Sequence, residues 1–269
     1  MGKTTKIDWA DATWSPVTGC LNDCEYCYAR KIAERFNGRS ASHTSAGNRP
    51  IDKEGHFIHW LDEEAKKYDK SGKLVVAPYP FGFEPTFHRY KLGIPAEWKE
   101  PKSIFVCSMG DLFGDWVPTE WIVEVFEACK KAPRHSYFFL TKNPQRYIEL
   151  ADEGLLPELP NFWYGTTTDR DGKPFFFCED FNTYVSVEPI LEDFQIEDVS
   201  PDCYVNWVIV GAETGRRKDR VIPQKEWIMK FADLCKKTGT PLFMKESLRE
   251  LMGDDFVQEL PFNKEGESE

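Results

Sequence analysis

Short apolar runs separated by amphipathic stretches limit the folds open to this chain more than any other feature. Six runs rich in Val, Ile, Phe and Trp predict strands at 104–108, 137–141, 162–166, 184–187, 207–210 and 242–244, with a further strand expected just before Cys20. The segments between them predict helices at 28–36, 119–131, 144–151 and 224–237. This alternation is typical of parallel strands joined by helices, in either a doubly wound sheet or a barrel.

Two segments interrupt the alternation. Residues 37–102 are rich in Gly, Pro, His and aromatic side chains and are too long for an ordinary connection, so we predict an insertion with a short helix near 60–68, placed as a lid over the site. The link at 168–183 is short, and we expect no complete crossover helix there.

Length, charge and cysteine content narrow the class of protein. The chain has 269 residues, and we predict one large domain over 1–262 followed by an acidic tail at 263–269. A net charge of −11 argues against a protein that coats nucleic acid non-specifically.

No apolar run approaches the length of a membrane span, and the start of the chain lacks the apolar core of a signal peptide, so we expect a cytoplasmic protein. Its eight cysteines should then be metal ligands or buried thiols.

Three of those cysteines are concentrated in one short segment. Cys20, Cys24 and Cys27 lie within eight positions and are followed at once by a predicted helix. An ordinary 4Fe-4S cluster has four protein ligands, so three thiolates leave one iron open to bind S-adenosylmethionine and cleave it reductively. The alternatives are a structural zinc site, which needs a fourth ligand from elsewhere, and a ferredoxin-type electron carrier, for which this chain is large.

The spacing Cys-x3-Cys-x2-Cys, with the aromatic Tyr26 before the last cysteine, resembles the signature of the radical S-adenosylmethionine superfamily. Further phrases resemble a family of phage-type proteins of uncharacterised function that are similar in outline to spore photoproduct lyase; they lie at 14–20, 105–113, 140–143, 186–189 and 210–215. The resemblance implies an α/β fold, a partial (β/α)6 TIM-type barrel with the insertion after its first βα unit. It also implies an enzyme whose chemistry takes place at the carboxyl ends of the strands.

The resemblance implies roles for residues that follow the strands. Ser108, Gly110 and Asp111 would form the turn that receives the methionine amine of the cofactor, and Lys142 would face its carboxylate. Cys107 is similar in position to a cysteine hydrogen donor. The structural alternatives are a capping or turn aspartate, a solvated lysine and a small buried thiol.

Glu188 and Glu213 follow later strands, where a buried carboxylate is costly without a partner. The hydroxyls of the adenosine ribose or the substrate could provide that partner, and the alternative is a structural hydrogen bond. Tyr26, beside the cysteines, is expected to pack at the cluster and shield it from water.

A basic segment follows the predicted strand at 207–210. It contains four cations in five positions, and these are Arg216, Arg217, Lys218 and Arg220. Such a run is either a solvated surface or a phosphate site for a nucleotide or nucleic-acid substrate. The resulting prediction is an enzyme that abstracts hydrogen from its substrate and receives electrons from a reductant such as flavodoxin or ferredoxin. The alternative is a non-catalytic iron–sulfur or zinc protein on a degenerate barrel.

Overall fold

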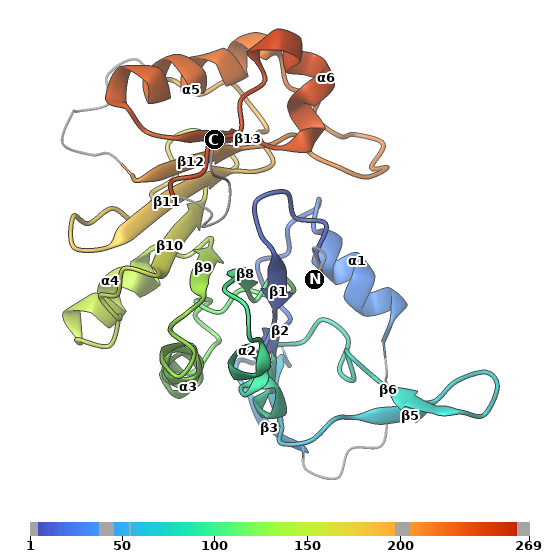
Figure 1. The fold of residues 1–269 in the computed structure, drawn as a ribbon. Helices are drawn as coiled ribbons and strands as arrows, with labels where there is room; N and C mark the ends of the chain where they lie inside the picture. Colours follow the sequence, from blue (N-terminus) through green and yellow to red (C-terminus); the bar gives the residue numbers. More distant parts are fainter. Residues whose placement is uncertain (1–4, 38–45, 54, 197–204, 263–269) are drawn as a thin grey trace. The chain divides into compact units, whose positions relative to one another are not determined.

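The computed structural model describes residues 5–37, 46–53, 55–196 and 205–262 (Figure 1). The chain forms two compact units, Met1–Pro157 and Glu158–Glu269, here called the N-terminal and C-terminal units. The acidic tail predicted at 263–269 lies outside the described residues.

Parallel strands and three longer helices make up the first part of the N-terminal unit. The strands follow the order β1-β8-β9, and all of them are parallel. Their bounds are Ala12–Trp14 for β1, Ser103–Val106 for β8 and Ser136–Thr141 for β9, and the helices are α1 (Tyr28–Arg35), α3 (Thr119–Lys130) and α4 (Gln145–Asp152). Helix α3 begins directly after Pro118 and buries an apolar face that includes Ile122 and Phe126. The ring of Phe126 contacts that of Phe139 on β9 edge to face, with 5.3 Å between the ring centroids.

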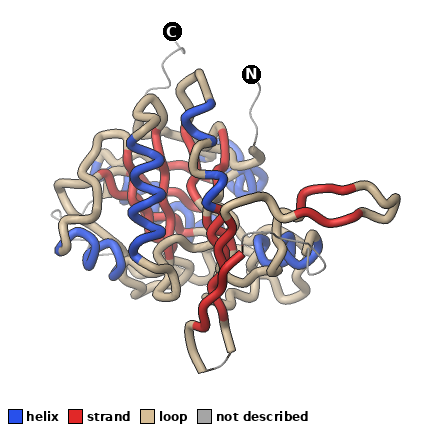
Figure 2. Tube along the Cα trace, turned by 90° about the horizontal axis from the view of Figure 1, so that it is seen from below, coloured by secondary structure: helices blue, strands red, loops and turns tan. Residues whose placement is uncertain are grey.

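The insertion forms a second sheet within the N-terminal unit. Its strand order is β2-β7-β4-β3, with β2 at Val17–Thr18, β7 at Thr86–His88, β4 at Phe57–Leu61 and β3 at Ala46–Pro50. Short helices follow at η1 (Arg89–Lys91) and α2 (Ile94–Glu97). A separate hairpin, β5 (Lys66–Tyr68) with β6 (Leu74–Val76), extends away from this sheet (Figure 2).

The short helix predicted near 60–68 is wrong. That segment contains the end of β4 and the whole of β5, because β4 pairs with both β3 and β7 and packs Ile58 and Leu61 into the core. Pairing with strands distant in the sequence decided the structure of a short aromatic segment whose local pattern was ambiguous. The role of the insertion as a lid stays a prediction.

The C-terminal unit contains four parallel strands in the order β10-β11-β12-β13. They are β10 (Phe162–Thr167), β11 (Asn182–Val187), β12 (Trp207–Val210) and β13 (Leu242–Met244), accompanied by α5 (Lys225–Thr238), η2 (Glu246–Leu248), α6 (Arg249–Met252) and η3 (Gly253–Asp255). Helix α5 packs Ile228 and Phe231 into a core with Val208 and Val210 of β12. It ends at Gly239, whose φ of 71° lies in the left-handed region that glycine adopts without strain.

The predicted partial (β/α)6 TIM-type barrel is wrong, although the α/β class is confirmed. A (β/α)6 barrel has six parallel strands, whereas the described residues contain seven, three in the N-terminal unit and four in the C-terminal unit. The helices do not alternate with them regularly: no helix lies between β10 and β11, as the short link at 168–183 predicted, and none lies in the described part of the link from β11 to β12. The connection from β1 to β8 contains the second sheet, so it is no simple βα unit.

Gly19, directly after β2, is a position where both the backbone conformation and a close neighbour exclude a side chain. Its φ is 85°, and a Cβ atom would lie 2.3 Å from the carbonyl oxygen of Glu84. We expect Gly19→Ala to lower the free energy of unfolding by at least about 3 kcal/mol, because conformational strain and a backbone clash act together. Gly72→Ala is the matched control, since Gly72 has a φ of 80° but open space around it, and should cost only about 1–2 kcal/mol. Equal losses in urea unfolding would contradict the clash.

Candidate functional site

The cysteine-containing loop, residues 19–27, runs from the end of β2 to the start of α1. Its backbone is bonded to the segment after β8, because Gly19 N donates to Met109 O at 2.9 Å and Gly19 forms a parallel bridge with Gly110. A Cβ atom on Gly110 would lie 2.7 Å from Gly19 O. Two backbones can approach this closely only with glycine at the contact. The contact with Gly19 therefore explains why residue 110 is a glycine.

The three thiols of the loop are half-buried and lie among backbone polar groups. Cys27 is the N-terminal cap of α1, and its Sγ accepts a hydrogen bond from Arg30 N at 3.4 Å. Cys20 Sγ accepts one from Asn22 N at 3.4 Å, and Cys24 Sγ lies 3.9 Å from Asn22 O.

Electrostatics shows that the thiols are neighbours. Burial, together with the charges of Asp111, Cys24 and Cys27 and against a backbone hydrogen bond from Asn22 that lowers it, raises the pKa of Cys20 to about 12. In the part of the chain that the structure describes, however, no three His, Cys, Asp or Glu side chains form a group that could hold a metal ion.

Asp111, which follows β8, is the centre of a buried hydrogen-bond network. Its Oδ1 accepts from Thr141 Oγ1 at 2.7 Å and from Phe113 N at 3.1 Å. Its Oδ2 accepts from Asn22 Nδ2 at 3.1 Å and from Lys142 N at 3.2 Å. Burial raises the pKa of the carboxyl group, and the four hydrogen bonds oppose that shift. The carboxylate therefore joins the cysteine-containing loop to the ends of β8 and β9.

Tyr26 of the loop and Tyr28, the first residue of α1, contact residues that follow the strands. Lys142 Nζ lies 5.4 Å from the centroid of the Tyr26 ring, a cation–π distance, and Tyr28 OH donates to Ser108 O at 2.7 Å. The structure thus brings Tyr26, Ser108, Gly110, Asp111 and Lys142 together around the cysteine-containing loop. Their contacts with a cofactor stay predictions.

Cys107 occupies an unusual backbone position at the end of β8. Its φ of 57° lies in the left-handed region, which is costly for a residue other than glycine, and its N donates to Trp14 O at 2.8 Å. The side chain is buried, and burial raises its pKa to about 12, so the sulfur carries its proton at neutral pH. A protonated thiol fits both a hydrogen donor and a small buried residue, and the donor role stays a prediction.

The other predicted residues lie in the C-terminal unit. Glu188 pairs with Lys245 at 3.7 Å. Glu213 is buried and accepts hydrogen bonds from Arg217 Nε and Nη2, both at 2.8 Å. That contact, the largest cause, keeps the pKa of Glu213 below its usual value. Each glutamate therefore has a cationic partner within the protein, and cofactor or substrate contacts of either stay predictions.

The four cations after β12 have different environments. Arg217 is held by Glu213, and Arg220 donates from Nη1 to Gly215 O at 3.1 Å. Arg216 and Lys218 are exposed. Phosphate binding by this segment stays a prediction. Of the four cations, Arg217 already forms an ion pair within the protein, with Glu213.

Replacing Arg217 with alanine should destabilise the C-terminal unit in a pH-dependent way. The Glu213 side chain is 2% exposed, and removing one partner of a buried ion pair leaves the other charge uncompensated, so we expect a loss of about 2 kcal/mol near pH 7. Because Arg217 lowers the folded-state pKa of Glu213, the pair stabilises the fold above the ordinary carboxyl pKa, and this contribution is lost as pH falls through the folded value.

The measurement is urea unfolding of wild type and Arg217→Ala between pH 7 and pH 3, where the difference should shrink. Arg170→Ala is the matched control, since Arg170 forms an exposed pair with Glu192 and should lose under about 1 kcal/mol. A difference between wild type and Arg217→Ala that stays constant over this pH range would contradict the prediction.

Sequence reasoning missed the residues that support the site. Asn22 and Thr141 carry contacts to segments far away in the chain, and Asn22 and Asp111 are separated by 89 positions. Only Thr141 could have been identified from the local sequence, because it ends a predicted strand and precedes Lys142. The Glu213–Arg217 pair could have been found, because its spacing of four residues brings the two side chains together in a tight loop.

The N-terminal unit combines parallel strands with a three-thiol loop whose backbone is joined to the segment after β8, which defines an α/β protein with a candidate metal-binding loop. The chain belongs to the DUF5131 family, described as proteins of unknown function, whose model matches residues 4–253. No curated protein and no solved structure matches the chain. None of the helices in the described ranges is long and apolar enough to cross a membrane.

Proposed function

We propose that the chain binds a 4Fe-4S cluster through Cys20, Cys24 and Cys27 and is a radical S-adenosylmethionine enzyme. The observation that carries the proposal is the loop itself: it presents three half-buried thiols and is joined to the end of β8 by the contact of Gly19 with Met109 and Gly110. A cluster with three thiolate ligands supplies an open iron site for reductive cleavage of S-adenosylmethionine.

The donor set fits such a cluster. Thiolates are the ligands that iron–sulfur clusters use, and the Cys20 pKa responds to the charges of both other thiols. Cys27 caps an eight-residue helix, and its Sγ already accepts a hydrogen bond from a backbone N–H. Because the three thiols form no metal-binding group in the structure, cluster binding requires them to move closer together.

The surrounding residues have separate tasks in this proposal. Lys142, held over the Tyr26 ring, provides an ammonium group for the carboxylate of the methionine moiety. Asp111 accepts four hydrogen bonds from the protein, so we assign it the positioning of the loop rather than contact with the cofactor amine. Tyr26 lies beside the cysteines and limits access of water. Electrons come from a reductant such as flavodoxin or ferredoxin, in the cytoplasm.

The decisive experiment is anaerobic reconstitution with iron and sulfide, followed by reduction with dithionite in the presence of S-adenosylmethionine. We expect release of 5′-deoxyadenosine by the wild-type protein and none by Cys24→Ala. Cys178→Ala, which removes another half-buried thiol, is the matched control and should behave as wild type. A full cluster without deoxyadenosine would favour a non-catalytic iron–sulfur protein, and zinc without iron would favour a structural site.

A further inference from the structure

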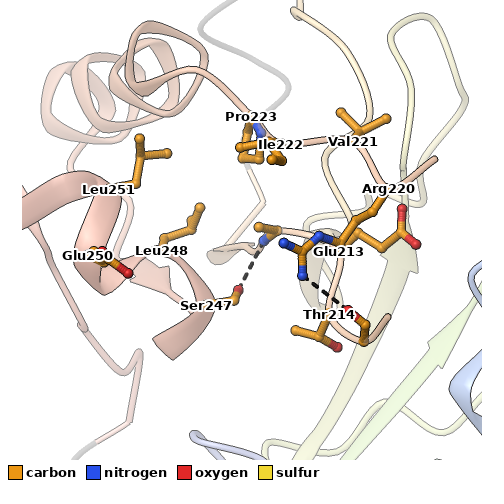
Figure 3. A pocket seen from close by; sticks show the side chains of 12 residues that line it. Glu213, Thr214, Arg220, Val221, Ile222, Pro223, Ser247, Leu248, Glu250 and Leu251 are labelled. Atoms are coloured by element: carbon orange, nitrogen blue, oxygen red, sulfur yellow. Dashed lines mark hydrogen bonds between the residues drawn. The ribbon is translucent and has the colours of Figure 1, made fainter. Parts of the chain in front are cut away.

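The C-terminal unit contains a cavity of about 650 Å³ between the loop after β12 and the η2–α6 segment (Figure 3). Cavities of this size accommodate small organic ligands. The cavity is formed by residues of this unit alone, and none of the candidate cluster ligands lines it.

One part of the cavity is apolar. Leu248 and Leu251 lie across the open space from Val221, and Ile222 and Pro223 border it between them (Figure 3). Ile222 is 73% exposed, which is unusual for an isoleucine. A flat apolar group seated here would cover Ile222 and contact the two leucines, so burial of its faces favours a planar ring.

The rest of the lining is polar and charged: the cation Arg220 lies on the loop after β12 with Glu213, and Glu250 lies on the α6 side. Ser247 Oγ accepts from Ala212 N at 3.1 Å, which leaves its hydroxyl hydrogen to donate to a ligand. The charge of Glu213 is balanced by Arg217. Arg220 donates one hydrogen bond to Gly215 O, and a guanidinium group has five N–H donors.

We propose that this cavity binds a phosphorylated nucleoside. The base lies between Ile222 and the two leucines, Leu248 and Leu251. The hydroxyls of Thr214 and Ser247 face the polar edges of the ligand, and Arg220 binds the phosphate. The exposed cations Arg216 and Lys218 lie on the same loop and add to the positive charge near the phosphate. A purely apolar acid would leave the hydroxyls unpaired, and phosphate alone would leave Ile222 uncovered. The inference goes beyond the proposed function and does not depend on a cluster.

The test is calorimetric titration of the full-length protein, without S-adenosylmethionine or reductant, with AMP, GMP, CMP and UMP. The comparison ligands are the four nucleosides, inorganic phosphate and a short single-stranded oligonucleotide. We expect at least one monophosphate to bind, and to bind about tenfold or more tightly than its nucleoside or phosphate alone. Tighter binding of the oligonucleotide, with competition by the monophosphate, would identify the ligand as a nucleotide within a strand.

The variants locate the site. Arg220→Ala should weaken binding of the monophosphate about tenfold, and Ile222→Ser should weaken it severalfold, because they remove the phosphate contact and an apolar contact. Both side chains are exposed, so the variants should keep the wild-type melting temperature. Arg170→Ala, which removes a guanidinium group elsewhere in the unit, should bind as wild type.

Four results would overturn the inference: no monophosphate binds; phosphate alone binds equally well, as an adventitious ion only; the nucleoside binds equally well; or Arg220→Ala leaves binding unchanged. The deoxyadenosine assay is a separate measurement, so failure of either proposal leaves the other standing.

Discussion

Cys20→Ala, Cys24→Ala and Cys27→Ala are each expected to leave the reconstituted protein without a 4Fe-4S cluster. Each substitution removes one of the three proposed ligands, and two thiolates do not hold a cluster that ordinarily uses four. The iron content should fall from about four atoms per chain to near zero, and the brown colour of the sample should disappear. Iron analysis and the visible absorption spectrum measure both effects.

Other thiols provide the controls for this prediction. Cys129 and Cys235 are buried on helices α3 and α5, so their alanine variants can lose stability but should keep the cluster. Cys178 is half-buried like the loop thiols, and Cys178→Ala should keep both stability and cluster. Wild-type spectra for all three loop variants would remove the basis of the proposed function.

Asp111→Asn is expected to lower the free energy of unfolding by about 2–4 kcal/mol. The amide has nearly the shape of the carboxylate, but its NH2 group would face two donors in place of an accepting oxygen. The hydrogen bonds at stake come from Asn22, Phe113, Thr141 and Lys142. Buried donors without acceptors bear the full cost of desolvation. Urea unfolding measures the loss.

A matched substitution distinguishes the effect of losing the hydrogen-bond network on stability from the effect of losing one negative charge. Asp152→Asn changes an exposed aspartate at the end of α4 and should shift stability by less than about 0.5 kcal/mol. If Asp111→Asn were equally mild, the four hydrogen bonds would not be holding the loop. In the cluster assay we expect Asp111→Asn to retain the three ligands but to incorporate less iron, because the loop has lost its anchor to β8 and β9.

Strand and helix positions were largely predictable from the sequence, and their spatial arrangement was not. Leu242–Met244 and Trp207–Val210 are β13 and β12 as predicted, and the helix predicted at 224–237 is α5 shifted by one residue. Continuous apolar runs identify buried parallel strands from local information alone. The second sheet of the N-terminal unit instead pairs Val17 with Phe87, and no local pattern indicates a partner so far along the chain.

In the candidate site, too, the positions of residues along the chain were predictable and their contacts in space were not. The cysteine spacing singled out the loop, and the resemblance to radical S-adenosylmethionine enzymes implied that Asp111 and Lys142, which follow strands, would lie near it. The sequence could not show that Asp111 is saturated by internal hydrogen bonds. Nor could it show that Arg217 is engaged by Glu213 while Arg220 lines a cavity. Both facts depend on how loops fold back on themselves, which the identities of single residues do not specify.

The pairing of β1 with β8, in which Ala12 lies beside Ile104, sets an order of events during synthesis of the chain. The cysteine-containing loop leaves the ribosome early, but the residues that fasten it, at 109–111 and 141–142, emerge only after the whole insertion. Closing so long a loop is slow, because its entropy is lost before the contacts form. We therefore expect the nascent thiols to stay accessible to solvent and oxidants until β9 has been made, so that assembly of the proposed cluster would follow translation of the first unit rather than accompany it.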